Sequence, residues 1–180
     1  IYINFEICMA NKLVFLGTGT SQGVPIIGCN CHVCQSNDPH DKRLRTSAYI
    51  EYCGLHLLID AGPDFRQQIL ANSISQIDAV LLTHQHKDHT GGLDDIRAFN
   101  YFRKGAFPIY AEKNVQDSLK MEYSYAFAEQ KYPGVPEYAL HTIDENPFTI
   151  TKTLPDGSVG SMEITPIRKK FGCVSPLPIL

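Results

Sequence analysis

Three histidines and one aspartate lie within a six-residue segment that closely follows a short apolar run. The run, residues 78–82, has the length and composition of a buried β-strand. Histidines two positions apart in an extended segment point to the same side, so His84 and His86 can bind one metal ion together. Asp88 and His89 lie beyond a bend and can turn toward a neighbouring position. A loop that merely carries polar residues would explain one histidine but not this spacing, so the segment predicts a metal site.

The segment from His84 to His89 is similar to the HxHxDH signature of the metallo-β-lactamase superfamily. The resemblance implies an α/β fold, an αβ/βα sandwich that carries a two-metal hydrolytic centre. It implies that His84 and His86 bind the first of two divalent ions, zinc or manganese, and that Asp88 and His89 bind the second. Two cations about 3.5–4 Å apart activate a bridging water and neutralise charge on a displaced oxygen. We therefore expect Asp88 to be a catalytic residue as well as a metal ligand.

An aspartate ends the second strand of a predicted hairpin. Residues 47–53 and 55–60 are predicted to form two strands around Gly54, with Asp60 at the end of the second. In the superfamily that this chain resembles, an aspartate at this place supports the metal-binding loop. A carboxylate close to imidazoles can orient them. We therefore expect Asp60 to be a catalytic residue that acts by orienting the metal ligands.

Three cysteines lie close together in a long loop predicted for residues 24–45. Cys29, Cys31 and Cys34 can supply three corners of a tetrahedral structural zinc site. Cysteines this close in sequence indicate metal ligands in a reducing compartment instead of disulfides. The alternative is that they are small buried apolar residues, which are common in cores. The fourth ligand is open between a group from outside this chain and three candidates within it: His32, His40 and Cys53.

The residues around these cysteines make the resemblance more specific. Residues 28–34, together with residues 43–47, resemble the superfamily branch that contains phosphoribosyl 1,2-cyclic phosphate phosphodiesterase. In that branch the three cysteines help to hold a structural zinc, and a histidine from late in the chain completes the site. Arg43 and Arg45 alternate on a segment that enters a strand, and guanidinium groups suit phosphate oxygens. They are candidate substrate-binding residues, with a solvated or structural pair as the alternative.

The motifs predict a metal-dependent hydrolase that acts through a metal-activated hydroxide, and the resemblance implies a phosphodiesterase whose substrate is a small, cyclic phosphodiester. One alternative is an endonuclease of the tRNA 3′-processing type, or another hydrolase of this fold. A second alternative is an inactive, truncated remnant that binds metal. The formal charge of −3 and the scattered basic residues argue against nucleic acid as the partner. No apolar run approaches the roughly 18 residues of a membrane span, and no export signal is recognisable, so we expect a cytoplasmic protein.

Both ends of the sequence depart from the superfamily pattern. Residues 1–8 precede a natural-looking start at Met9, so we expect a single domain over residues 9–180 behind a leader that is non-native or mis-called sequence. The superfamily takes a third histidine, a bridging aspartate and a final histidine from its C-terminal half, but Phe171 stands near the place of the third histidine. We therefore expect a truncated sandwich, the N-terminal half plus the start of the second sheet. Uncovered apolar faces would make it marginally stable and prone to self-association, for example as a homodimer.

Periodicity predicts the remaining elements. Strands are expected at residues 12–17, 107–110, 138–143, 148–153 and 162–167, and helices at residues 63–70, 93–102 and 114–127. The apolar side chains of residues 93–102 are expected to form a core face. Four aromatic side chains in or near the last helix are expected to pack in the core, with a cap over a substrate as the alternative: Tyr123, Tyr125, Phe127 and Tyr132.

Overall fold

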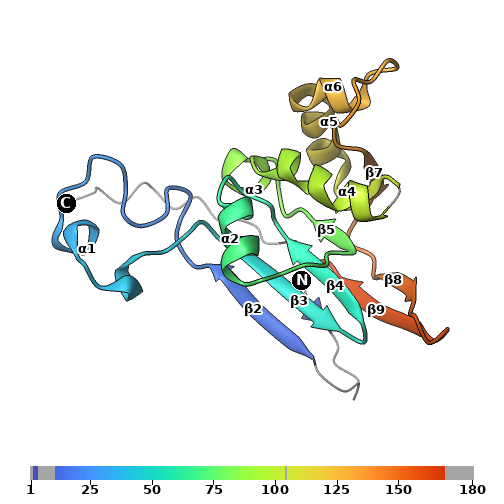
Figure 1. The fold of residues 1–180 in the computed structure, drawn as a ribbon, viewed down its shortest axis with the longest axis horizontal. Coiled ribbons are helices and arrows are strands. Elements are labelled where there is room, and N and C mark those ends of the chain that lie inside the picture. Colours follow the sequence, from blue (N-terminus) through green and yellow to red (C-terminus); the bar gives the residue numbers. More distant parts are fainter. Residues whose placement is uncertain (1, 4–10, 104, 169–180) are drawn as a thin grey trace.

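The computed structural model describes residues 2–3, 11–103 and 105–168, and its strands form two sheets (Figure 1). The larger sheet has six strands in the order β2-β3-β4-β5-β6-β7, and the smaller has three in the order β1-β9-β8. The larger sheet consists of β2 (Lys12–Gly17), β3 (Ser47–Tyr52), β4 (Leu55–Ile59), β5 (Ala79–Leu81), β6 (Phe107–Ala111) and β7 (Tyr138–Thr142). The smaller consists of β1 (Tyr2–Ile3), β8 (Phe148–Thr153) and β9 (Val159–Thr165). Every strand predicted from periodicity is present, within a few residues at either end.

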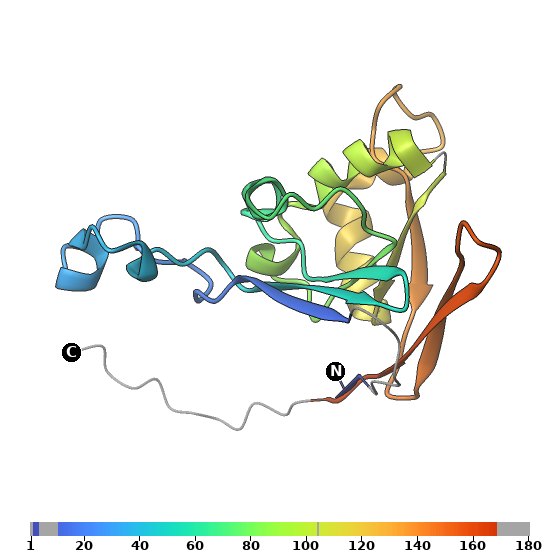
Figure 2. The same cartoon turned by 60° about the horizontal axis from the view of Figure 1, so that its bottom comes forward.

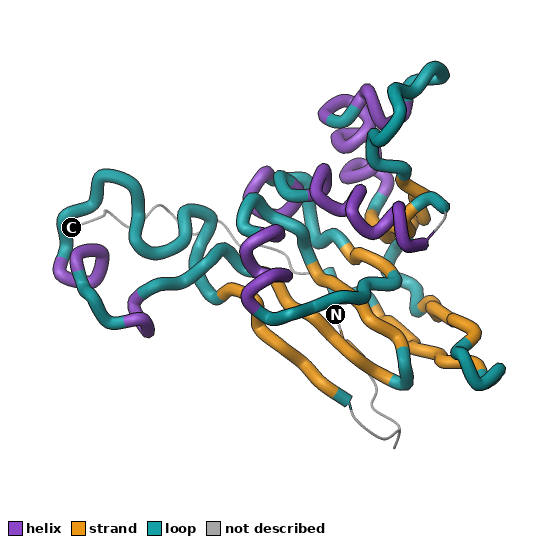
Figure 3. The backbone as a smooth tube through the Cα atoms, in the orientation of Figure 1, coloured by secondary structure: helices purple, strands orange, loops and turns teal. Residues whose placement is uncertain are grey.

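The helices are short and most of them cover one face of the larger sheet, whereas β8 and β9 lie across the other face (Figure 2). The helices on the sheet are α2 (Phe65–Ala71), α3 (Lys87–Thr90), η2 (Leu93–Ile96), α4 (Arg97–Arg103), α5 (Lys113–Glu122) and α6 (Ser124–Phe127). Two single-turn helices, α1 (His32–Gln35) and η1 (Pro39–Asp41), lie in a long loop that projects from the sheets (Figure 3). No helix in the described part of the chain is long and apolar enough to span a membrane.

Strand direction changes within the larger sheet and sets the position of the candidate site. Strands β2, β3 and β4 pair antiparallel, while β4, β5, β6 and β7 pair parallel. Ile59 at the end of β4 is level with Leu81 at the end of β5. Asp60 and the histidine segment therefore emerge side by side at the carboxyl ends of neighbouring parallel strands, where open α/β sheets commonly bind ligands.

The larger sheet is buried on both faces because its central strands carry apolar residues at successive positions. Val80 and Leu82 face the helices in one core cluster, whereas Ala79 and Leu81 face the smaller sheet in a second cluster. This arrangement of helices, sheet and second sheet agrees with the expected sandwich. Among the described residues, no helix covers the outer face of β8 and β9 (Figure 2).

Two helix predictions are corrected by the structure. Leu93 and Ile96 are buried as expected, but Tyr101 is 70% and Phe102 87% exposed. The segment begins as a 3₁₀-helix and becomes an α-helix at Arg97, and this change of period turns the later side chains away from the core. The predicted helix over residues 114–127 is interrupted at Tyr123, which separates α5 from α6. The expected leader (most of residues 1–8) and Phe171 lie outside the described residues.

The edge strand β2 carries exposed apolar side chains. Val14 and Leu16 pack on the helix side, so Leu13 and Phe15 point to the opposite face, where they are 52% and 69% exposed. An exposed apolar edge favours pairing between chains. We therefore expect the parent protein to associate with itself as its concentration rises.

The substitution Phe15→Thr is expected to weaken this association while changing the melting temperature little, because the phenyl ring is mostly in solvent. Light scattering coupled to size-exclusion chromatography over a concentration series measures the effect. Tyr132→Thr is the control, since Tyr132 is an aromatic residue outside the edge strand that is 80% exposed. Equal self-association of the parent and Phe15→Thr would show that the exposed side chains of β2 do not mediate this association.

Candidate metal centre

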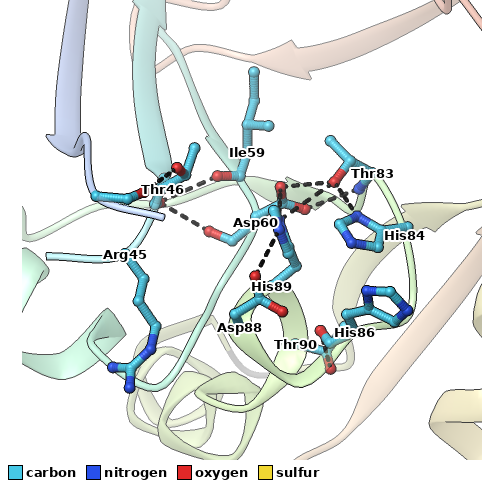
Figure 4. Close-up of polar contacts among 12 residues, drawn as sticks. Arg45, Thr46, Ile59, Asp60, Thr83, His84, His86, Asp88, His89 and Thr90 are labelled. Carbon is cyan, nitrogen blue, oxygen red and sulfur yellow. Dashed lines mark hydrogen bonds and ion pairs between the residues drawn. The ribbon is translucent and has the colours of Figure 1, made fainter. Parts of the chain in front are cut away.

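A buried carboxylate lies at the centre of the candidate site. Asp60 is 2% exposed, and its Oδ1 accepts a hydrogen bond of 2.8 Å from the amide of Thr83. Its Oδ2 accepts one of 2.8 Å from the Thr83 hydroxyl and lies 2.6 Å from Nδ1 of His89 (Figure 4). Asp60 also has a positive φ of 60°, a conformation that is costly for non-glycine residues and occurs often at functional sites. Asp60 therefore fixes both the start of the histidine segment and the ring of His89.

The structure brings the four predicted metal ligands together, and we call them the His–Asp cluster: His84, His86, Asp88 and His89. The ring centroid of His84 is 4.0 Å from that of His89 and 4.7 Å from that of His86. Nε2 of His89 lies 3.2 Å from Oδ2 of Asp88. The tightest group consists of His84, Asp88 and His89, whose ligand atoms all lie within 4.8 Å of one another. His86 stands beside this group, next to His84.

This donor set suits a divalent ion such as zinc or manganese. A carboxylate accepts hydrogen bonds, so the contact with Asp60 places the ring hydrogen of His89 on Nδ1 and leaves Nε2 for a metal. Asp88 and His89 would hold the ion together with His84, with His86 as a further donor. The sequence pattern placed His84 and His86 on one ion and Asp88 and His89 on another. In the structure His84, from the first pair, lies with Asp88 and His89, so the two ions would be bound in one compact centre.

Opposite pKa shifts act on two of the histidines. Burial lowers the pKa of His84, whereas the hydrogen bond to Asp60 raises the pKa of His89 despite partial burial. A raised pKa keeps His89 protonated to a higher pH, and a metal ion must displace that proton to bind.

Metal occupancy of the His–Asp cluster is therefore expected to fall as the pH is lowered, because protons compete with the metal for His89. Equilibrium dialysis against zinc between about pH 8 and pH 5 tests this, using a variant with all three clustered cysteines changed to serine so that only one site is counted. Occupancy that does not change over this range would contradict the assigned role of His89.

The three cysteines also converge, and we call them the cysteine cluster: Cys29, Cys31 and Cys34. Their sulfur atoms lie within 4.8 Å of one another in the projecting loop. Cys31 immediately precedes α1 and Cys34 lies within it, so one helical turn brings the two together. The backbone amide of Cys34 lowers the pKa of Cys31, which favours the thiolate that a metal requires. Three corners of a zinc site are thus present.

None of the three candidates within the chain joins the cysteine cluster as a fourth ligand. The described residues that form this group contain no histidine, aspartate or glutamate. Nδ1 of His40 lies 2.8 Å from Oδ1 of Asp38. Cys53 lies in the turn between β3 and β4, where its carbonyl closely approaches Gly160 of β9. The alternative that stays open is a fourth ligand from outside this chain.

The two candidate arginines do not lie at the His–Asp cluster. The guanidinium of Arg45 is 2.7 Å from Oδ1 of Asp64, and its Nε donates a 2.9 Å hydrogen bond to the carbonyl of Ser21. Its side chain points away from the histidines in Figure 4. Arg43 is exposed and its Nε donates to the carbonyl of His40. Arg45 therefore ties the base of the projecting loop to the start of α2, which is the structural alternative to phosphate binding.

A cleft of about 600 Å³ adjoins the cluster. Its lining includes Thr83, His84 and His89 together with the charged residues Glu112, Asp144, Glu145 and Arg168. Arg168 forms ion pairs with both glutamates. The sequence assigned no role to Thr83. Its hydroxyl donates a hydrogen bond to Oδ2 of Asp60 and lies 3.0 Å from Nδ1 of His84. Its place directly before the first histidine was the available signal.

Known proteins resemble this chain over most of its length. The model of the beta-lactamase superfamily domain matches residues 56–173. An octanoyltransferase of Porphyromonas gingivalis is 45% identical over 171 residues, which are 94% of this chain and 32% of that protein. The crystal structure of a diphosphatase from the PhnP family shares 41% identity with a TM-score of 0.69, covering 77% of this chain and 52% of that one. Zinc-bound PqqB from Methylobacterium extorquens shares 25% identity with a TM-score of 0.61, covering 87% and 59%.

The chain thus spans about a third of that octanoyltransferase and between half and three fifths of either solved chain. The matched residues include β4 from its second residue, β5 and the whole His–Asp cluster. The fold expected from the HxHxDH resemblance is confirmed, and the chain belongs to the beta-lactamase superfamily.

Proposed function

We propose that this chain is part of a metal-dependent hydrolase that cleaves a small phosphodiester, with a cyclic phosphodiester as the favoured substrate. The observation that carries the proposal is the convergence of His84, Asp88 and His89 within 4.8 Å, with His89 held by the buried Asp60. The similarity to a diphosphatase from the PhnP family supports chemistry on phosphorus. The octanoyltransferase is matched over 32% of its length, so its name is not carried over to this chain.

The residues of the cleft explain why a metal would be required. Three carboxylates and one arginine line it, so without a cation the cleft would repel an anionic phosphodiester. A divalent ion bound there would offset that charge, act as a Lewis acid on a phosphoryl oxygen and lower the pKa of a water molecule. Asp60 and Thr83 would keep the ligands in position, and the cleft has the size of an ordinary small-molecule site.

The first test counts metal per chain by mass spectrometry on protein purified without chelator. We expect the parent to carry clearly more metal than a His84→Ala/His86→Ala variant, and the cysteine cluster to retain its own ion in both. His141→Ala is the control, because His141 is an exposed histidine on β7, outside the His–Asp cluster. Equal metal in the parent and the double variant would remove the basis of the proposal.

The second test compares cyclic and linear phosphodiesters as substrates of the metal-loaded chain. Hydrolysis of cyclic phosphodiesters that disappears in His84→Ala/His86→Ala would support the proposed reaction. Absence of turnover by a parent chain with a filled His–Asp cluster would favour the alternative of a metal-binding remnant. The same assay is then repeated on a chain extended to the length of the relatives. Turnover by the extended chain alone would show that the reaction needs further ligands from outside residues 1–180.

A further inference from the structure

The helix that carries two of the proposed ligands is too short to define its own orientation. Helix α3 contains only Lys87–Thr90, a single turn, and isolated helices of this length are unstable in water. Asp88 and His89 lie in its middle, so their direction depends on what holds the ends of the turn. One side is held by the segment after β4, where the amide of Ala61 donates a 2.8 Å hydrogen bond to the carbonyl of His89.

A tyrosine holds the other side. The hydroxyl of Tyr123 donates a 2.8 Å hydrogen bond to the carbonyl of Thr90, the last residue of α3. Both residues are buried, with Tyr123 6% and Thr90 0% exposed. A carbonyl at the end of a helix has no partner within the helix, and this hydroxyl supplies one. Burial raises the pKa of Tyr123, so its hydroxyl keeps the hydrogen that it donates.

The residue before the tyrosine reaches the other end of the same turn. Glu122 forms an ion pair with Lys87, the first residue of α3. The ammonium of Lys87 also lies 5.7 Å from the centre of the Tyr123 ring, within the range of a cation–π contact. Glu122 is the last residue of α5, and Tyr123 lies between α5 and α6. The break between the two helices therefore contacts both ends of α3.

The ring of Tyr123 is itself fixed by its neighbours. It packs edge-on against Tyr125 and Tyr138, with ring centroids 6.2 Å and 6.1 Å away. It also belongs to the core between the helices and the larger sheet. A hydroxyl on a ring held this firmly can define the position of the carbonyl that accepts from it.

We propose that Tyr123 is a positioning residue for the His–Asp cluster, which fixes α3, together with the Glu122–Lys87 pair, so that Asp88 and His89 face His84. This inference rests on the proposed metal-dependent function. It adds a contact from a part of the chain more than 30 residues away from the ligands.

The variant Tyr123→Phe tests the proposal because it keeps the ring and removes only the hydroxyl. We expect the affinity of the His–Asp cluster for zinc to fall by about 10-fold, the lower end of the range for partners that orient metal ligands. Competition with a chelator, in a chain whose cysteine cluster is changed to serine, measures that affinity. The chain with intact cysteines is loaded with cobalt, whose thiolate absorption reports the cysteine cluster. We expect this absorption to be the same in Tyr123→Phe and in the parent.

Tyr125→Phe is the matched control. Its hydroxyl lies 2.5 Å from Oδ1 of Asp94 on η2, so the variant removes a tyrosine hydrogen bond that does not involve α3. We expect it to leave zinc affinity at the parent value. An equal loss in both variants, or no loss in Tyr123→Phe, would overturn the proposal.

Hydrogen exchange on the metal-free protein gives a readout that does not depend on metal binding. In Tyr123→Phe the amides of Thr90 and Gly91, which close the turn of α3, are expected to exchange several-fold faster than in the parent. Unchanged exchange refutes the positioning role even if the parent binds metal. A parent that binds no metal at the cluster, combined with faster exchange in the variant, refutes the proposed function but supports the hold of Tyr123 on α3.

Discussion

Replacement of Asp60 by asparagine is expected to weaken metal binding at the His–Asp cluster by about 10- to 100-fold. The carboxylate contacts the amide and hydroxyl of Thr83 and lies 2.6 Å from Nδ1 of His89. An asparagine can keep one acceptor, but its NH₂ group would face donors that now have no partner. Each unsatisfied buried donor costs about 1–3 kcal/mol, so the free energy of unfolding is expected to fall as well.

Asparagine is the informative substitution because Asp60 has a positive φ of 60°. Asparagine tolerates that conformation nearly as well as aspartate, whereas alanine would add about 1–2 kcal/mol of backbone strain to the result. The variant should also return the pKa of His89 toward its ordinary value, since the contact with Asp60 is the main cause of the increase. Protons should then compete with the metal at His89 less strongly, so the affinity difference between the parent and Asp60→Asn should be largest at high pH and shrink as the pH falls.

Chelator competition and urea unfolding measure the two effects, with Asp78→Asn as the control. Asp78 is also a largely buried aspartate, and its carboxylate accepts a hydrogen bond from the amide of His56. It precedes β5, whereas the His–Asp cluster follows that strand. Asp78→Asn is expected to cost stability without changing metal affinity. Unchanged zinc affinity in Asp60→Asn would show that Asp60 does not orient the cluster.

The substitution Gly62→Ala is expected to remove metal from the His–Asp cluster and to destabilise the fold by more than about 3 kcal/mol, the upper end of ordinary overpacking. A Cβ at this position would lie 2.1 Å from the carbonyl oxygen of Asp88 and 3.0 Å from its carbonyl carbon. Both are backbone atoms, so no rotamer change can relieve the contact. Either the segment after β4 or α3 must move, and α3 carries the ligands.

Gly105→Ala provides the control, because nothing lies within 4 Å of the Cβ that it would add. It is expected to change neither stability nor metal content by a measurable amount. Thermal unfolding and metal counts on the three proteins check the prediction. A Gly62→Ala variant that is as stable and as metal-rich as the parent would show that Gly62 and α3 are less closely packed than the structure has them.

The sequence was most informative where the relevant contacts are local. The spacing of His84, His86 and His89 predicted a cluster because six residues after a strand cannot separate far. Asp60 could be placed beside them because both segments leave neighbouring parallel strands. The exposed Tyr101 and Phe102 were misplaced because periodicity alone does not reveal where a 3₁₀-helix becomes an α-helix.

The contacts that the sequence did not predict join distant segments. The hydrogen bond from Tyr123 to Thr90 spans 33 positions, and no pattern in either segment marks the other as its partner. Arg45 was a candidate substrate-binding residue, but it forms an ion pair with Asp64, 19 positions away, at the base of the projecting loop. Such pairings depend on how the helices and loops pack on the sheet, which follows from the three-dimensional fold.

Both clusters take their ligands from segments of only six residues, Cys29 to Cys34 and His84 to His89. Such ligands remain near neighbours after the chain unfolds, so the unfolded chain can also capture metal. Binding to the unfolded state offsets part of the stabilisation that a ligand gives to the folded state. Zinc is therefore expected to raise the melting temperature less than its affinity for the folded chain alone would predict, and to be held by the chain before folding is complete.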